Sequence, residues 1–231
     1  MRMKIGGYMY IENNDILTFL GYKNQKLDDS ILNIINSCKE ESINLINERF
    51  VYGIYDIEVD KEIRLLDTNI VLSGESIRRH LKDCNKVIIF ACTLGIDIEK
   101  KIRLYEKIEL TKSIILDACA SLLVESLCDD IEKMIKKDLS KDYNYTLRFS
   151  PGYGDLDISL QSGIIRLLDA NRKIGLTCSS NFILMPRKSV TAIIGISNSD
   201  IKSEYDICDS CHARENCVYR KNNKKCTNHN K

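Results

Sequence analysis

The apolar positions of the chain predict long helices and at least one fully buried strand. Between residues 28 and 48, isoleucine, leucine and cysteine recur about every 3.6 positions, which indicates an amphipathic helix. The same period over residues 112–139 predicts the longest helix, with a wide apolar stripe and lysines near its C-terminal end. The run KVIIFACTLG (86–95) is almost continuously apolar and ends in glycine, which is typical of a strand buried on both faces.

Shorter patterns complete the expected fold. Further helices are predicted over residues 15–22, 74–83, 96–106 and 157–169, and further strands over 52–59, 62–66, 69–72, 146–149, 174–178 and 189–197. Ser73 is expected to cap the helix over 74–83. Strands and helices are interleaved without a strict strand–helix–strand repeat. We therefore expect one α+β domain over residues 1–200, with a mostly antiparallel twisted sheet and packed helices, and a short cysteine-rich tail over 201–231.

Charge and composition exclude several classes of protein. The chain has 34 Lys and Arg against 33 Asp and Glu, so no overall field attracts nucleic acid or an anionic membrane. No apolar run approaches the ~20 residues that span a bilayer, and the first residues lack the apolar core of a secretory signal. Three histidines offer little to a hydrolase that needs a histidine base. We expect a cytoplasmic location, with neither nucleic acid nor a membrane as partner.

The ten cysteines fall into two groups. Six are scattered through apolar or helical stretches and are expected to be small buried hydrophobic residues in a reducing compartment: Cys38, Cys84, Cys92, Cys119, Cys128 and Cys178. The other four, Cys208, Cys211, Cys217 and Cys226, crowd into a polar tail that burial alone cannot order. Their density predicts a metal centre. The spacing matches no ferredoxin closely, so zinc, an iron–sulfur cluster and a metal-free thiol tail all remain open.

One candidate binding segment is RFSPGYGD (148–155), which follows a predicted strand. Its proline and two glycines allow the backbone to pass close to a ligand and expose its amides. Arg148 at the strand end can hold a carboxylate with two parallel hydrogen bonds, and Tyr153 offers a flat face to a ring or a cation. Taken alone, the segment also fits an ordinary surface turn.

The second candidate segment is LMPRKSVTAIIG (184–195). A proline turn leads into a strand that ends at Gly195, where a backbone could meet a ligand. In isolation this is simply an edge strand.

Together the two segments resemble the reactivation domain of cobalamin-dependent methionine synthase. The signature of that family is R-x-x-x-G-Y followed downstream by a P-x-x-S-V-[ST]-[AG] strand. The segment ILDACASLLVESLCDDIE (115–132) resembles the long helix before the family's arginine motif, and IGLTCSSNFILMP resembles the link between the two motifs. The resemblance covers residues 85–197.

The resemblance implies a site for S-adenosylmethionine in a shallow groove at a sheet edge. In that family, cobalamin that has lost an electron is inactive. An outside reductant such as flavodoxin or ferredoxin returns one electron, and S-adenosylmethionine donates a methyl group. The cobalamin would be carried by the cobalamin-binding module of a separate methionine synthase, with this chain as a stand-alone subunit.

Carried over by position, the resemblance also implies the ligand contacts. Arg148 would hold the ligand carboxylate, and Glu125 on the long helix would face the sulfonium or the amino group. Ser150, Gly152 and Tyr153 would line the site, the last two facing the corrin. Backbone groups of Ile194 and Gly195 would meet the ligand from the second motif.

Three departures from the family pattern keep other functions open. An aspartate that contacts S-adenosylmethionine has no visible counterpart in residues 1–60, and Ser121 stands where the family has an acid. After the Gly-Tyr pair, a P-A-C-P-like run is replaced by residues 154–156. One alternative is a module that caps or escorts a corrinoid protein without methyl transfer. Another is an electron-transfer adaptor that uses a metal in the tail.

Overall fold

The computed structural model describes residues 11–22, 27–139 and 142–199, and every structural statement below concerns these residues. Their centre is a six-stranded sheet in the order β3-β2-β1-β4-β8-β5, in which all neighbouring strands are antiparallel. The strands are β1 Arg49–Val59, β2 Ile63–Leu65, β3 Val71–Leu72, β4 Lys86–Thr93, β5 Asn144–Tyr145 and β8 Ser189–Ser197. The α+β fold with a mostly antiparallel sheet is confirmed.

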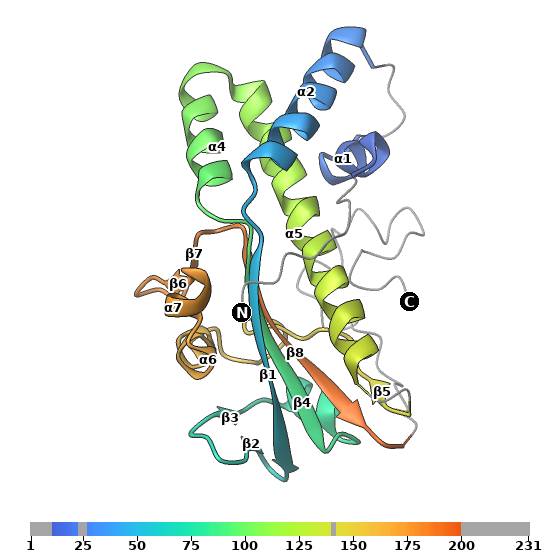
Figure 1. The fold of residues 1–231 in the computed structure, drawn as a ribbon, viewed down its shortest axis with the longest axis vertical. Coiled ribbons are helices and arrows are strands. Elements are labelled where there is room, and N and C mark those ends of the chain that lie inside the picture. Colours follow the sequence, from blue (N-terminus) through green and yellow to red (C-terminus); the bar gives the residue numbers. More distant parts are fainter. Residues whose placement is uncertain (1–10, 23–26, 140–141, 200–231) are drawn as a thin grey trace.

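Helices cover both faces of this sheet (Figure 1). On one face lie α1 Asn13–Phe19, α2 Asp29–Leu45, α4 Asp97–Ile108 and α5 Leu110–Asp138. On the other face lie α3 Glu75–Leu81, α6 Leu160–Leu168 and α7 Ala170–Ile174, next to the small hairpin of β6 Thr177–Cys178 and β7 Leu184–Met185. Alternate residues of β4 enter the two hydrophobic cores, and all but Lys86 are buried, as its apolar run predicts.

Helix α5 is the central helix of the first core, as its stripe predicts. Leu123, Leu127 and Ile131 on this helix are at most 1% exposed. Ile114, which the periodicity assigns to the same stripe, is 50% exposed because it lies near the junction with α4, where the core ends.

The expected cap of α3 by Ser73 is wrong. The Ser73 hydroxyl instead donates to Glu62 Oε1 at 2.8 Å. The carboxylate of Asp155 accepts hydrogen bonds from the backbone N–H groups of Glu75 (2.6 Å) and Ser76 (2.9 Å). A side chain from the 148–155 segment thus satisfies the first amides of α3 and attaches that segment to the helix.

Replacing Asp155 with alanine is expected to lower the free energy of unfolding by about 1 kcal/mol, because two helix-terminal amides lose their acceptor. Burial acts to raise the pKa of Asp155, but the hydrogen bonds from the amides of Ser76 and Glu75 outweigh it and hold that pKa below its ordinary value. This carboxylate therefore stabilises the fold above its ordinary pKa and loses that effect as the pH falls through the lowered value. Urea unfolding at several pH values should show the deficit shrinking in acid. A deficit that stays constant with pH would contradict the capping role, and Asp155→Asn is the matched control.

Two predicted strands differ from the structure: β5 covers 144–145 in place of the expected 146–149, and the strand expected over 174–178 is shorter. Beyond Tyr145 only isolated contacts continue the pairing, including a bridge between Phe149 and Ile193. In the predicted strand over 174–178, Gly175 ends α7 with a φ of +69°, and pairing is confined to Thr177 and Cys178. The ends of both strands depend on local turns that periodicity does not detect.

The predicted tail ligands Cys208, Cys211, Cys217 and Cys226 lie outside the described residues. Within the described ranges, no cluster of three or more His, Cys, Asp or Glu side chains could hold a metal ion. None of the described helices has the length and apolar character needed to cross a membrane.

Candidate functional site

A cavity of about 210 Å³ lies where the two candidate segments meet. Arg148, Ser150 and Tyr153 line it from the first segment, and Ser189 and Thr191 line it from the second. Glu125 of α5 also lines this cavity, so the structure brings together four of the residues that the sequence proposes as ligand contacts: Glu125, Arg148, Ser150 and Tyr153. Ligand-binding cavities commonly measure ~300–1,000 Å³. This cavity is smaller than that range and would therefore enclose only part of a nucleoside ligand.

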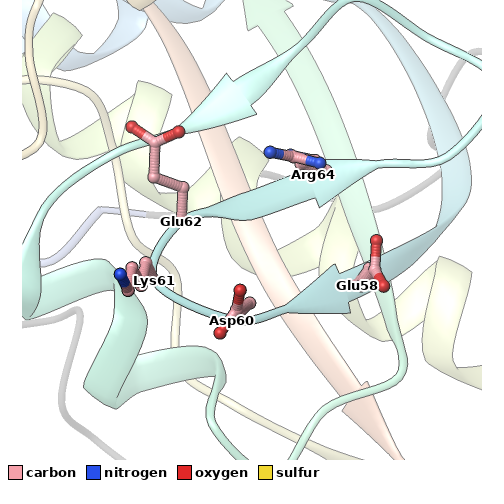
Figure 2. Close-up of a pocket in the computed structure, with 5 residues that line it drawn as sticks. All are labelled: Glu58, Asp60, Lys61, Glu62 and Arg64. Carbon is pink, nitrogen blue, oxygen red and sulfur yellow. The ribbon is translucent and has the colours of Figure 1, made fainter.

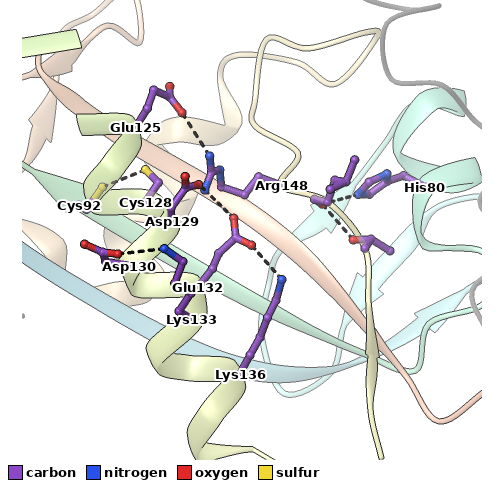
Figure 3. Close-up of polar contacts among 12 residues, drawn as sticks. His80, Cys92, Glu125, Cys128, Asp129, Asp130, Glu132, Lys133, Lys136 and Arg148 are labelled. Atoms are coloured by element: carbon purple, nitrogen blue, oxygen red, sulfur yellow. Dashed lines mark hydrogen bonds and ion pairs between the residues drawn. The ribbon is translucent and has the colours of Figure 1, made fainter. Parts of the chain in front are cut away.

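The charged end of the cavity is built on one face of α5 (Figure 3). Arg148 Nη1 donates to Asp129 Oδ1 at 2.7 Å and to Glu132 Oε1 at 2.6 Å, and Arg148 Nη2 donates to Glu125 Oε2 at 3.2 Å. The three acids lie four and three positions apart, which places them on one side of the helix. Lys136 pairs with Glu132 at 2.9 Å, so three carboxylates face two cations. Glu125 and Arg148 line the cavity, and the net negative charge of the whole cluster favours a ligand that brings positive charge.

Burial raises the pKa of Glu125 above its ordinary value, although the Arg148 guanidinium acts in the opposite direction. The folded protein therefore binds the Glu125 proton more tightly than the unfolded chain does. The resulting stabilisation is present below the ordinary pKa and is lost as the pH rises through the raised pKa.

Glu125→Gln is expected to leave the free energy of unfolding within about 1 kcal/mol of the wild type at pH 7. Since glutamine resembles the protonated acid, the variant should gain stability relative to the wild type as the pH rises from about 4 to 8. The same change should weaken binding of a cationic ligand, measured by calorimetry. A variant that fails to fold would instead identify Glu125 as a structural ion-pair partner.

The 150–153 turn places Tyr153 at the mouth of the cavity. Tyr153 N donates to Ser150 O at 3.1 Å, and Gly152 adopts a φ of +92°, which favours glycine. Tyr153 is 45% exposed, and its ring lies 6.4 Å, between centroids, from the ring of the buried Phe149. Phe149 also packs against His80, with ring centroids 5.1 Å apart. The tyrosine ring is thus held at the surface beside the cavity.

Ile194 and Gly195 do not lie at this cavity. Ile194 is fully buried in the core on the α5 side of the sheet. Gly195 N donates to Thr146 Oγ1 at 2.8 Å, and Gly195 O accepts from Thr146 N at 3.0 Å. A Cβ at position 195 would collide with Cys84 and Leu81, so glycine is needed there for packing.

The other end of β8 presents an open backbone edge to the cavity. Phe149 and Ile193 exchange two backbone hydrogen bonds of 2.9 and 2.8 Å, so the Ile193 N–H and C=O point away from β4. Alternation along the strand points the same groups of Thr191 and Ser189 in that direction. There the neighbouring segment has already turned away into residues 150–153. Ser189 and Thr191 of this strand therefore line the cavity, whereas Ile194 and Gly195, which the sequence proposes as contacts, lie away from it.

Gln161 is a cavity residue that the sequence reasoning missed. It lies on the buried face of α6, with Ile164 and Leu168 one and two turns further on. Its side-chain oxygen accepts a hydrogen bond from the hydroxyl of Thr191 on β8. A polar residue on the apolar face of the helix predicted over 157–169 was the available signal.

The turn before β8 is attached to two helices. Lys188 Nζ contacts Asp117 Oδ1 at 2.8 Å and donates to Ser121 Oγ at 2.8 Å. The carboxylate of Glu99, 7% exposed, accepts a hydrogen bond from Arg187 N at 2.9 Å. Ser121, which departs from the family pattern, therefore helps to position the second motif.

A larger hollow of about 460 Å³ lies over the β1–β2 hairpin (Figure 2). It is lined by charged side chains, among them Glu58, Asp60 and Arg64, and none of the proposed ligand contacts lines it. Its size alone does not make it a binding site, because a hairpin surface of solvated charges offers a ligand no apolar wall.

Comparison with known proteins agrees with this fold. Residues 76–222 match the family described as "Vitamin B12 dependent methionine synthase, activation domain". The fold is similar to that in the structure "Crystal Structure of the MetH Reactivation Domain bound to AdoHcy", with a TM-score of 0.62 and 14% identity, over 94% of this chain and 78% of that one. No curated protein sequence matches. The family match continues beyond residue 200, and the domain boundary placed there stays a prediction. The chain belongs to the family of activation domains of vitamin B12-dependent methionine synthase.

Proposed function

We propose that this chain binds S-adenosylmethionine in the Arg148 cavity and supports reductive remethylation of cobalamin carried by the cobalamin-binding module of a methionine synthase. The observation that carries the proposal is the convergence of both family motifs, with Glu125 of α5, on one cavity at the edge of β8. The similar solved domain is described as bound to AdoHcy, the product that S-adenosylmethionine leaves after methyl transfer, which supports this ligand class.

The charges of the cavity suit the ligand. S-adenosylmethionine carries a sulfonium and an ammonium, which the acids on α5 would attract. Its carboxylate would compete with these acids for Arg148, whose planar guanidinium suits bidentate pairing. Once the ligand carboxylate has replaced Glu125 on Arg148, the Glu125 carboxylate would face the ligand's positive charge. We therefore keep Arg148, Glu125, Ser150, Gly152 and Tyr153 as proposed contacts, and we transfer the backbone contacts from Ile194 and Gly195 to Ser189 and Thr191.

The reaction itself asks little of the protein side chains. One electron from a reductant gives a reduced cobalamin that is a strong nucleophile, and it takes the methyl group from the sulfonium, which leaves as the thioether. Alignment of two bound molecules can supply ~7–11 kcal/mol of rate enhancement. The chain's task is to hold the ligand so that its methyl group faces the corrin beside Tyr153.

A reactivation assay tests the function. The chain is mixed with a cobalamin-binding module in the cob(II)alamin form, S-adenosylmethionine and a chemical reductant, and methylcobalamin is followed by its absorbance. We expect methylcobalamin to form only when the chain is present. Binding of S-adenosylmethionine without methyl transfer would favour the alternative of a capping or escort module. The separate synthase, the flavodoxin or ferredoxin donor and the cytoplasmic location stay predictions.

We also propose one metal centre held by Cys208, Cys211, Cys217 and Cys226, on the sequence spacing alone. Elemental analysis of anaerobically prepared protein should find about one equivalent of zinc, or iron with sulfide, and deletion of residues 202–231 should remove it. Iron would favour a role of the tail in electron transfer. Absence of both metals would contradict the proposal. The deletion should leave ligand binding intact, because all proposed contacts lie between residues 125 and 191.

A further inference from the structure

Gln161 is a buried polar side chain in the cavity wall. It is 7% exposed, and the apolar lining residues Phe149 and Leu184 are 3% and 9% exposed. A carboxamide offers an acceptor oxygen and two N–H donors, and buried polar groups in folded proteins are almost always hydrogen-bonded. The partners of the two ends of this side chain therefore indicate its role.

Only one end of the Gln161 side chain has a partner among the described residues. The oxygen accepts from the hydroxyl of Thr191, itself 1% exposed, which fixes the plane and orientation of the carboxamide. In the described part of the chain, no hydrogen bond is found for Gln161 Nε2. Since Gln161 lines the cavity, we infer that its N–H donors are available to a ligand there.

The cavity separates charged from neutral polar groups. Arg148 and Glu125 form the charged end, whereas Gln161, Thr191 and the open edge of β8 provide neutral donors and acceptors. A purine base is flat and neutral, with ring nitrogens that accept hydrogen bonds in its plane. Such a ring matches the neutral end, and the sulfonium and amino acid portion match the charged end.

We propose that Gln161 is a specificity-determining residue that donates a hydrogen bond from Nε2 to a ring nitrogen of the purine base, with Thr191 as its positioning residue. This inference rests on the proposed binding of S-adenosylmethionine. It goes further by stating that α6 recognises the purine base of the ligand, through a side chain that lies outside both sequence motifs.

Calorimetry with S-adenosylhomocysteine tests the inference. Gln161→Met keeps the length of the side chain and removes its donors, and is expected to weaken binding about tenfold. Ser162→Ala is the matched control on the same helix, because Ser162 does not line the cavity and its hydroxyl donates to Ser159 O within the helix. It should bind like the wild type. If Gln161→Met fails to fold, Gln161→Glu keeps the acceptor for Thr191 without the amide donors, and the same loss is expected at neutral pH.

Purine analogues make the test specific to the base. The 1-, 3- and 7-deaza analogues of S-adenosylhomocysteine each lack one ring nitrogen. We expect one of them to bind the wild type about tenfold more weakly than the parent ligand does. The same analogue should bind Gln161→Met with the affinity that it has for the wild type. Binding of the parent ligand by Gln161→Met at wild-type affinity, or a variant effect that persists with all three analogues, would overturn the inference alone. Failure of the wild type to bind the parent ligand would instead overturn the proposed function.

Discussion

Arg148→Ala is expected to lower the free energy of unfolding by about 3–5 kcal/mol. The Arg148 side chain is 7% exposed and joins Glu125, Asp129 and Glu132, the last of which is 11% exposed. Its removal leaves three carboxylates on one face of α5, with Lys136 as the remaining cation of the cluster. Because partly buried like charges repel each other without their counter-ion, the loss should exceed that of an ordinary surface ion pair. Urea unfolding at pH 7 measures it.

A compensating substitution separates charge from packing. Arg148→Ala combined with Glu132→Gln removes one of the stranded carboxylates and should recover part of the lost stability. Arg148→Lys keeps the charge without the planar fork and should lose less than alanine. An Arg148→Ala variant within about 0.5 kcal/mol of the wild type would show that the cluster contributes nothing to the fold.

Ile131→Asp is expected to prevent folding altogether. Ile131 is fully buried on α5, in the core on one side of the sheet, and an unpaired carboxylate there costs several kcal/mol. That cost is comparable with the whole stability of a typical domain, ~5–15 kcal/mol. Leu123→Asp, at an equally buried position of the same helix, should behave in the same way.

Ile114→Asp provides the matched control, because Ile114 is on the same helix but 50% exposed. It should yield soluble protein with the circular dichroism and thermal transition of the wild type. A soluble, cooperatively folded Ile131→Asp variant would contradict the assignment of α5 as the central core helix.

The elements predicted best from the sequence are those with a continuous apolar pattern. Strand β4 and helix α5 carry strong periodic signals, and the structure confirms both. The cap of α3 could not be predicted, because Asp155, which supplies it, lies 80 residues further along the chain than Glu75. Pairing over such a distance depends on the tertiary fold and leaves no local pattern.

The sequence predicted which residues share the candidate site better than it predicted how they are arranged. Glu125, Arg148 and Tyr153 were expected at one site, and the structure places all three at one cavity. The open edge at Thr191 was not predicted, because it depends on where the partner segment leaves β8 after the contact of Phe149 with Ile193. The ion pairs of Arg148 likewise depend on the approach of two elements that are distant in sequence.

The central claim is that the cavity joining the two motifs binds S-adenosylmethionine. Its most direct test is isothermal titration calorimetry of the folded wild-type protein with S-adenosylmethionine. We predict saturable binding at one site, weakened in Glu125→Gln although the variant's free energy of unfolding at pH 7 stays within about 1 kcal/mol of the wild type. A wild-type protein that shows neither heat of binding nor a shift in its thermal transition at millimolar ligand would contradict the claim.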